Sequence, residues 1–227
     1  MGSDILKSGR FYFISDDFYN NFDKEKKLMQ NKENVDGKPA NRPCFFSFPD
    51  SNNSEIYWCV PISSKVEKYQ NIYDKKIEKQ IAKGIISPKC NTIKFGDVMG
   101  KKRAFLIQNM FPVTQEYVQS TYIDKNTHNE VTIDNAKEKE IIKNAKEVLK
   151  LSKRGIQIIF GDVHKIYSAL SAELEDKQKG ISNVVTSEKS KTAYFSRKQL
   201  NTSAQKIKEK EKLVPQQPTH KKSQGLE

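Results

Sequence analysis

The stretch CFFSFPDSNNSEIYWCV, at residues 44–60, decides the fold more than any other part of the chain. Its two ends, Cys44–Phe48 and Ile56–Val60, are short runs rich in aromatic and β-branched residues, which are typical of strands. The join at Pro49–Ser54 contains Pro, Asp, Asn and Ser, the residue types that form tight loops. The stretch therefore predicts two antiparallel strands joined as a hairpin.

Upstream of this hairpin, the sequence predicts a strand, a helix and a loop. Phe11–Ile14 is a short aromatic run suited to a strand, and Ser15–Asp17 can cap a helix that follows it. The expected apolar face of that helix consists of Phe18, Tyr19, Phe22 and Met29. The polar segment Asn31–Asn41 has the composition of a loop.

Downstream of the hairpin, the pattern changes to a helix and then to two extended runs. Apolar residues at helical spacing are Tyr69, Ile72, Tyr73, Ile77 and Ile81. Gly84 is a plausible end for this helix, because glycine adopts the left-handed conformation that ends many helices. Two β-like runs, Thr92–Phe95 and Arg103–Ile107, then flank Gly100 and predict a second pair of strands.

Two further helices complete the expected body of the protein. One starts near Asp134 and stops at Gly155, and the other is capped by Asp162. Strands and helices are mixed without the regular alternation of a doubly wound sheet. We therefore expect an α+β domain over residues 9–176.

The charge is concentrated at the end of the chain. The 227 residues carry a formal charge of +12, and residues 177–227 hold twelve Lys or Arg against four Asp or Glu. This basic, low-complexity tail has few large apolar residues, so we expect it to be disordered or marginally helical. An excess of positive charge favours polyanionic partners, because neutralised phosphates release condensed counterions. The tail is either a solvated extension or an accessory RNA-binding arm.

Several classes of protein and site are disfavoured by the sequence. Three widely spaced cysteines, at positions 44, 59 and 90, predict reduced thiols rather than a disulfide framework or a zinc site. The N-terminus lacks an apolar signal core, and no apolar run approaches the ~20 residues of a membrane span. These features predict a cytoplasmic protein that does not enter membranes.

Cofactor and metal sites are also disfavoured. The segment Gly96–Lys102 has three residues between its glycines where a phosphate-binding loop has four, and it lacks the Ser or Thr that holds magnesium. A hairpin turn is the plain interpretation. His128, His164 and His220 are isolated from one another, so no metal-ligating pair is evident. We expect neither a metal nor another cofactor.

The remaining candidate site lies directly after the second strand of the central hairpin. Ser63, Ser64 and Lys65 place two hydroxyls and a cation there, and Arg42 stands just before the first strand. An antiparallel hairpin would bring Arg42 close to the two serines. Taken alone, the pattern is more typical of a turn than of an active site.

The order of several short motifs resembles the endoribonuclease toxins of type III toxin–antitoxin systems, the ToxN/AbiQ/CptN family. The matching segments are Phe11–Ser15, Asn41–Phe45, Val60–Lys65 and Leu106–Val113. The likeness covers roughly residues 9–175 and leaves the tail unexplained. The family's Ser-Pro-Lys element is Ser64-Lys65 here, so either Lys65 or Lys68 fills the cationic position. The family tyrosine of the first helix aligns with Phe18, beside Tyr19.

The resemblance implies a fold and a reaction. The fold would be a highly twisted antiparallel sheet with peripheral helices, similar to the Kid/MazF toxins. Such toxins cleave RNA without a metal: the ribose 2′-OH attacks the adjacent phosphate and leaves a 2′,3′-cyclic phosphate. In that reading Ser64, with or without Ser63, contacts the scissile phosphate, and Arg42 and Lys65 stabilise the developing charge.

The resemblance also implies RNA-binding residues and partners. Tyr12 and Tyr19 either stack a splayed base or pack in the core, and Lys68 and Asn109 are further RNA-binding candidates. The partners would be cellular or phage RNA and a small repeat RNA antitoxin that folds as a pseudoknot. The toxin would process that RNA and be held by it in a closed assembly, in the setting of phage defence by abortive infection. Two alternatives remain open: a non-catalytic RNA- or DNA-binding protein, and a membrane-surface adaptor.

Overall fold

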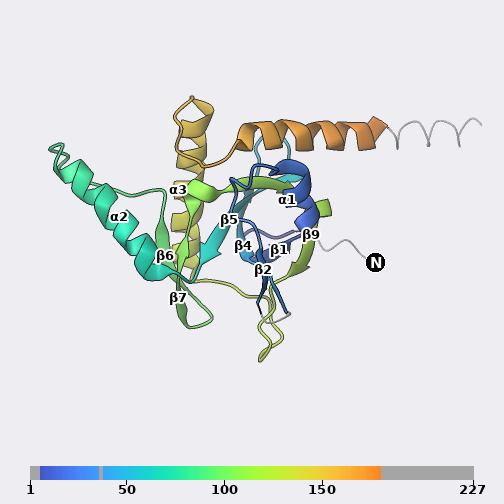
Figure 1. Ribbon diagram of the computed structural model, residues 1–227, viewed down its shortest axis with the longest axis horizontal. Coiled ribbons are helices and arrows are strands. Elements are labelled where there is room, and N and C mark those ends of the chain that lie inside the picture. Colours follow the sequence, from blue (N-terminus) through green and yellow to red (C-terminus); the bar gives the residue numbers. More distant parts are fainter. Residues whose placement is uncertain (1–5, 36–37, 180–227) are drawn as a thin grey trace, which may run out of the picture. The chain divides into compact units, whose positions relative to one another are not determined.

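The computed structural model describes residues 6–35 and 38–179 of the chain. The chain divides into two units, Met1–Glu173 and Leu174–Glu227, whereas the sequence places this boundary after Asp176. The first unit is α+β, as expected, and is built on a seven-stranded sheet (Figure 1). In the second unit, residues 174–179 are helical. The rest of the expected tail, residues 180–227, lies outside the described residues.

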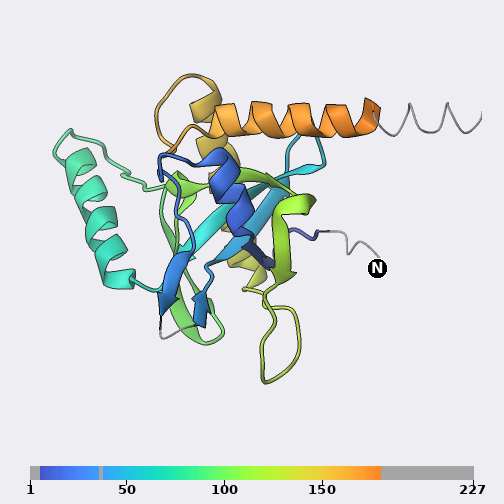
Figure 2. The ribbon, with the colours of Figure 1, turned by 45° about the vertical axis from the view of Figure 1, so that its right-hand side comes forward.

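The central hairpin is confirmed. β4 (Pro43–Pro49) pairs with β5 (Ile56–Ser63) in antiparallel register, with Cys44 opposite Pro61 and Phe46 opposite Cys59. The burial of nearly every residue of both strands shows that each face of the sheet is covered. In Figure 2, α1 passes in front of the sheet and α3 passes behind it.

The edge of β5 that faces away from β4 pairs with two different strands. Its first half pairs with β8 (Phe111–Thr114), and its last two residues pair with β7 (Lys101–Phe105). The full path is β6-β7-β5-β4-β1-β9, where β6 is Lys94–Val98, β1 is Phe11–Ile14 and β9 is Val118–Thr121. Neighbouring strands along this path are antiparallel. Within the described residues the path does not close on itself, so the sheet is open.

The segment before the hairpin differs from its prediction in two places. β1 (Phe11–Ile14) forms as expected, and its edge partner is β9 (Val118–Thr121). α1 (Asp16–Phe22) follows β1, but it ends before Met29. The helix stops because the Asp23 carboxylate accepts the backbone N–H groups of Lys27 and Leu28, at 2.8 and 3.0 Å, and turns the chain.

The expected loop at Asn31–Asn41 is wrong. β2 (Lys32–Val35) and β3 (Lys38–Ala40) pair there as a separate two-stranded sheet. Strand pairing uses backbone donors and acceptors that nearly every residue carries, so a polar segment can form strands without an apolar pattern.

The other predicted helices and the second pair of strands are present, the strands with shifted bounds, whereas β8 and β9 were not predicted. α2 (Val66–Ile81) lies beside β7, and Gly84 follows it with φ of +77°. β6 (Lys94–Val98) and β7 form the second hairpin. α3 (Asn135–Lys153) begins where the Asp134 carboxylate accepts the Lys137 N–H at 3.0 Å. Residues 163–173 are helical after Asp162, which accepts the Lys165 N–H.

Two short helical segments were not predicted. Residues Ile107–Asn109 and Gln115–Tyr117 form single 3-10 turns on either side of β8. The predicted extended run Arg103–Ile107 therefore ends as a strand at Phe105. The turn at Ile107–Asn109 is fully buried and redirects the chain from β7 into β8, which then pairs with the other half of β5.

The core is dominated by aromatic rings between the sheet and its helices. Phe11, Phe45 and Phe105 contact one another, with ring centroids 5.4 to 6.2 Å apart. Phe18 of α1 stacks on Phe111 of β8 at 5.2 Å. All three cysteines are buried free thiols, in agreement with the sequence.

A polar cluster anchors the turn of the central hairpin. The Asp50 carboxylate accepts hydrogen bonds from Trp58 Nε1 at 2.9 Å and from the Tyr167 hydroxyl at 3.0 Å. Lys153 Nζ lies 3.5 Å from the same carboxylate. Because Asp50 is buried, these donors replace the water it would otherwise need. The cluster joins the hairpin to α3 and to the helix after Asp162.

Candidate functional site

A cavity of about 490 Å³ opens where β4 begins and β5 ends. The β6–β7 hairpin and the segment after β9 complete its walls. The lining residues are Asn41, Arg42, Pro43, Ile62, Ser64, Val98, Met99, Lys101, Arg103, Tyr122 and Asn126. Three of them are cationic and none is acidic, so the cavity suits an anionic ligand.

Arg42 is held at the mouth of the β4–β5 hairpin. Its Nη1 donates to the Ile62 carbonyl oxygen at 3.2 Å, which confirms that the hairpin brings Arg42 to the end of β5. The buried Nε has no hydrogen-bond partner among the described residues. A guanidinium that uses one terminal nitrogen for the backbone still has donors on its other terminal nitrogen for an anion in the cavity.

The structure separates the roles of the two serines. Ser63 is 6% exposed, and its Oγ accepts the backbone N–H of Lys65 at 3.2 Å. Ser64 is exposed and lines the cavity. Neighbouring residues at a strand end point in different directions. The hydroxyl that shares the cavity with Arg42 is therefore that of Ser64, while Ser63 shapes the turn into α2.

The two lysines expected to supply positive charge lie elsewhere. Lys65 is exposed at the start of α2, and Lys68 Nζ lies 5.7 Å from the centre of its neighbour's ring, Tyr69. Neither belongs to the lining of the cavity. Lys65 directly precedes α2 and Lys68 lies in its first turn, so neither lysine shares the cavity lining with Arg42 and Ser64.

Lys101 and Arg103 of β7 provide the cavity's other two cations, and the sequence reasoning missed them. They stand two residues apart and so point to the same face of the strand. Lys102 lies between them and points away, with its Nζ 5.3 Å from the centre of the Phe95 ring. The basic run Lys101–Arg103 is visible in the sequence. Its position beside the end of β5 follows from the pairing of β5 with β7, which the sequence does not indicate.

Tyr12 and Tyr19 are packed in the core. They are 4% and 3% exposed. The Tyr12 ring contacts Phe46 with centroids 4.5 Å apart, and its hydroxyl accepts the Lys7 N–H at 3.0 Å. Burial raises the pKa of both phenols. These contacts favour core packing over base stacking for the two tyrosines.

Asn109 is also buried. It lies in the 3-10 turn between β7 and β8 and does not line the cavity. Its backbone N–H donates to the Leu106 carbonyl at 2.9 Å, and this hydrogen bond stabilises the turn. None of the predicted RNA-binding residues thus faces the cavity that contains Arg42 and Ser64.

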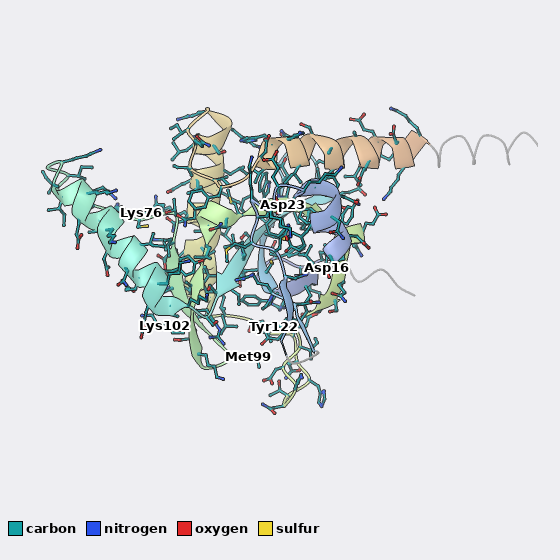
Figure 3. All side chains as sticks on the ribbon, viewed as in Figure 1. Asp16, Asp23, Lys76, Met99, Lys102 and Tyr122 are labelled. Carbon is teal, nitrogen blue, oxygen red and sulfur yellow. The ribbon has the colours of Figure 1, made fainter. Side chains whose placement is uncertain are left out.

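The remaining wall carries an aromatic ring, a thioether and two amides. Tyr122 follows β9, and Met99 stands at the tip of the β6–β7 hairpin. In Figure 3 these two side chains lie near one another, while Lys102 lies apart from them. Asn41 and Asn126 complete this wall. The sequence reasoning singled out none of these four residues for the site.

Over residues 6–35 and 38–179, no group of three or more His, Cys, Asp or Glu side chains is arranged to hold a metal ion. None of the described helices is long and apolar enough to span a bilayer. No protein-family model matches the chain, and no curated protein matches it.

Proposed function

We propose that this chain is a metal-independent endoribonuclease, and that the cavity beside Arg42 and Ser64 is its active site. The observation that carries the proposal is the gathering of three cations and one accessible hydroxyl in a single cavity without an acidic lining residue. A phosphodiester passing through a phosphorane gains negative charge, and fixed cations stabilise that charge.

In this proposal the residues act on the scissile phosphate. The ribose O2′ forms a bond to phosphorus, the bond from phosphorus to O5′ breaks, and a 2′,3′-cyclic phosphate and a 5′-hydroxyl result. The proton of the 2′-OH passes to a non-bridging phosphate oxygen, and Ser64 relays it from there to the departing O5′. Arg42 and Arg103 contact the non-bridging oxygens, and Lys101 adds positive charge. Ser64 donates a hydrogen bond to the phosphate and relays a proton to O5′.

Lys101 and Arg103 thereby replace the lysine that the family resemblance places next to Ser64. Both come from β7, which pairs directly with the last residues of β5. Charge supplied from a neighbouring strand can stabilise the phosphate as well as charge supplied from the adjacent sequence, because Coulomb energy depends on the distance between the charges and not on their positions in the chain.

The family assignment stays part of the proposal. The open α+β sheet and the order of the short motifs support kinship with type III toxins and the Kid/MazF fold. On that basis the protein acts in the cytoplasm on cellular or phage RNA. A small repeat RNA that folds as a pseudoknot would be processed by the enzyme and would hold it in a closed, inactive assembly. Abortive infection would be its biological setting.

One observation favours a second function, RNA binding without cleavage. The cavity lining contains no His, Asp or Glu, which are the side chains that most often accept a proton near neutral pH. A binding protein would need only the cations and the polar wall. The two functions differ in the state of the RNA after incubation.

The test is incubation of the refolded chain with a mixed single-stranded RNA in excess EDTA. The proposal predicts discrete fragments that end in 2′,3′-cyclic phosphates. RNA that stays intact while it binds the protein tightly and in a salt-sensitive way would establish the second function instead.

A further inference from the structure

The cavity is lined by two chemically different sets of residues, and the proposed reaction uses only one of them. The three cations, Arg42, Lys101 and Arg103, serve that reaction, whereas Tyr122, Met99, Asn41 and Asn126 line the same cavity without a part in it. These four residues are called the second wall below. We propose that this second wall is a binding site for one unpaired RNA base next to the scissile phosphate, with Tyr122 as the stacking residue. The inference rests on RNA being the ligand of the cavity.

Tyr122 has the properties of a fixed stacking platform. Its backbone N–H donates to the Phe11 carbonyl at 2.8 Å, and its carbonyl accepts the Val131 N–H at 3.0 Å. Its ring makes edge contacts with Phe13 at 5.4 Å and with Phe11 at 6.5 Å, yet it remains partly exposed toward the cavity. A ring held in this way loses little conformational entropy when a base stacks on it.

Met99 supplies a second, independent observation. Val98 pairs with Lys101, so Met99 and Gly100 form a two-residue hairpin loop with φ of +53° and +68°. Such a loop strongly prefers Asn, Asp or Gly at its first position, because a larger side chain is strained there. Met99 is nevertheless 42% exposed, so core packing does not explain the strain. A flexible thioether at the edge of the cavity is suited to contact an aromatic ligand.

The two amides are positioned to hydrogen-bond the edge of a base. The Asn41 Nδ2 donates to Gln119 Oε1 at 2.8 Å, which orients the amide. Asn126 lies in the turn after β9, where its N–H donates to the Asp124 carboxylate at 2.9 Å. Each asparagine offers a donor and an acceptor, the combination that base edges present.

The geometry selects single-stranded over double-stranded RNA. A base must leave its stack before an aromatic side chain can cover its face, and unpaired segments allow this at low cost. A cavity of about 490 Å³ is large enough for a nucleotide rather than for a phosphate alone. The enzyme should therefore read the base beside the bond that it cuts.

The test measures binding of short oligonucleotides by fluorescence anisotropy. The probes are 2′-O-methyl RNAs of about ten nucleotides, within the range that single-strand sites span, and an abasic oligomer of equal length with the same phosphates. The 2′-O-methyl group prevents cleavage, so the measurement does not depend on the proposed reaction. We expect the base-bearing probes to bind roughly 5- to 150-fold more tightly than the abasic oligomer, the range expected for one stacked base.

Three variants assign this preference to the second wall. Tyr122→Phe keeps the ring and should keep the preference, whereas Tyr122→Leu should abolish it. Met99→Asn should weaken the preference without loss of stability, since Asn favours the left-handed conformation. If Tyr122→Leu fails to fold, Met99→Asn decides the matter. The inference would be overturned if the wild-type chain bound the abasic oligomer as tightly as the base-bearing probes. It would also be overturned if folded Tyr122→Leu or folded Met99→Asn kept the full preference for base-bearing probes.

The result is distinguishable from a failure of the proposed function. A chain that prefers bases through Tyr122 but leaves RNA intact would be a binding protein, and the base site would stand. A chain that cleaves RNA but shows no base preference would be a nuclease without this site. A duplex probe, which should bind no better than the abasic oligomer, tests the selection for unpaired RNA.

Discussion

The Arg42 guanidinium donates through Nη1 to the carbonyl oxygen of Ile62 at 3.2 Å, across the open end of the β4–β5 hairpin. This bond fixes one side of the guanidinium to the strand that ends directly before Ser64. Arg42 and Ser64 both line the cavity. Arg42 and Ser64 are distant in sequence, and they line the same cavity because the β4–β5 hairpin brings its two ends together.

Replacing Arg42 by lysine should separate charge from geometry. Lysine keeps the positive charge, but its single nitrogen cannot hold the Ile62 carbonyl and also present a fork of donors to a phosphate. We expect Arg42→Lys to lower the cleavage rate by at least about tenfold, with a small change in thermal stability. Single-turnover cleavage and thermal unfolding of the same preparation measure the two effects. A variant with the wild-type rate would remove Arg42 from the site.

The alternation of side chains along β7 gives a matched pair of variants. Arg103→Gln removes a cation from the cavity, whereas Lys102→Gln removes the same charge from the opposite face of the strand. The net charge changes equally in both. We expect Arg103→Gln to slow cleavage by about 10²-fold and Lys102→Gln to slow it less than about threefold. Equal losses would mean that general charge, rather than the cavity, drives the reaction.

The two serines should differ in the type of defect that they cause. Ser64→Ala removes the hydroxyl that lines the cavity and should reduce cleavage by about 10²-fold while the protein stays stable. Ser63→Ala removes the acceptor of the Lys65 N–H and should cost about 1 kcal/mol of stability. Denaturant unfolding and cleavage assays on both variants check this division. The reverse pattern would show that Ser63 is the active hydroxyl.

The buried Asp50 predicts how stability depends on pH. Burial by itself raises the pKa of this carboxyl, but hydrogen bonds from Trp58, the Asn52 N–H and Tyr167, with the charge of Lys153, hold the pKa below its ordinary value. A carboxyl whose pKa is lower in the folded state stabilises the protein above its unfolded pKa of about 3.9. That contribution is lost as the pH falls through the folded pKa.

Asp50→Asn should therefore cost about 1–3 kcal/mol of unfolding free energy at neutral pH, and the cost should shrink below about pH 4. Urea unfolding of wild type and variant between neutral pH and pH 3 provides the measurement. A stability difference that stays constant over this range would show that Asp50 keeps the same pKa in the folded and unfolded protein.

Elements of the fold were predictable where neighbouring residues in the sequence specify them. The strands at residues 44–60 and the glycine at position 84 are specified by their immediate neighbours, and the structure contains them. The strands Lys32–Val35 and Lys38–Ala40 carry no apolar pattern, so the sequence does not indicate that they pair. The end of α1 depends on where one carboxylate, that of Asp23, finds two backbone donors.

The candidate site was predictable only where the hairpin itself builds it. Arg42 and Ser64 meet because adjacent strands fold back on each other, which the sequence indicates. Lys101 and Arg103 reach the cavity through the pairing of Ile62 with Phe105, a contact between strands separated by a whole helix. The burial of Tyr12 and Tyr19 likewise follows from packing against distant rings rather than from any local pattern.

The most direct test of the central claim is to map the RNA ends produced by the purified, refolded chain in excess EDTA. We expect discrete cuts that leave 2′,3′-cyclic phosphate and 5′-hydroxyl ends, and that form about 10²-fold more slowly in Arg103→Gln but at nearly the wild-type rate in Lys102→Gln. Intact RNA, or cuts that require a divalent metal or that persist unchanged in Arg103→Gln, would contradict it.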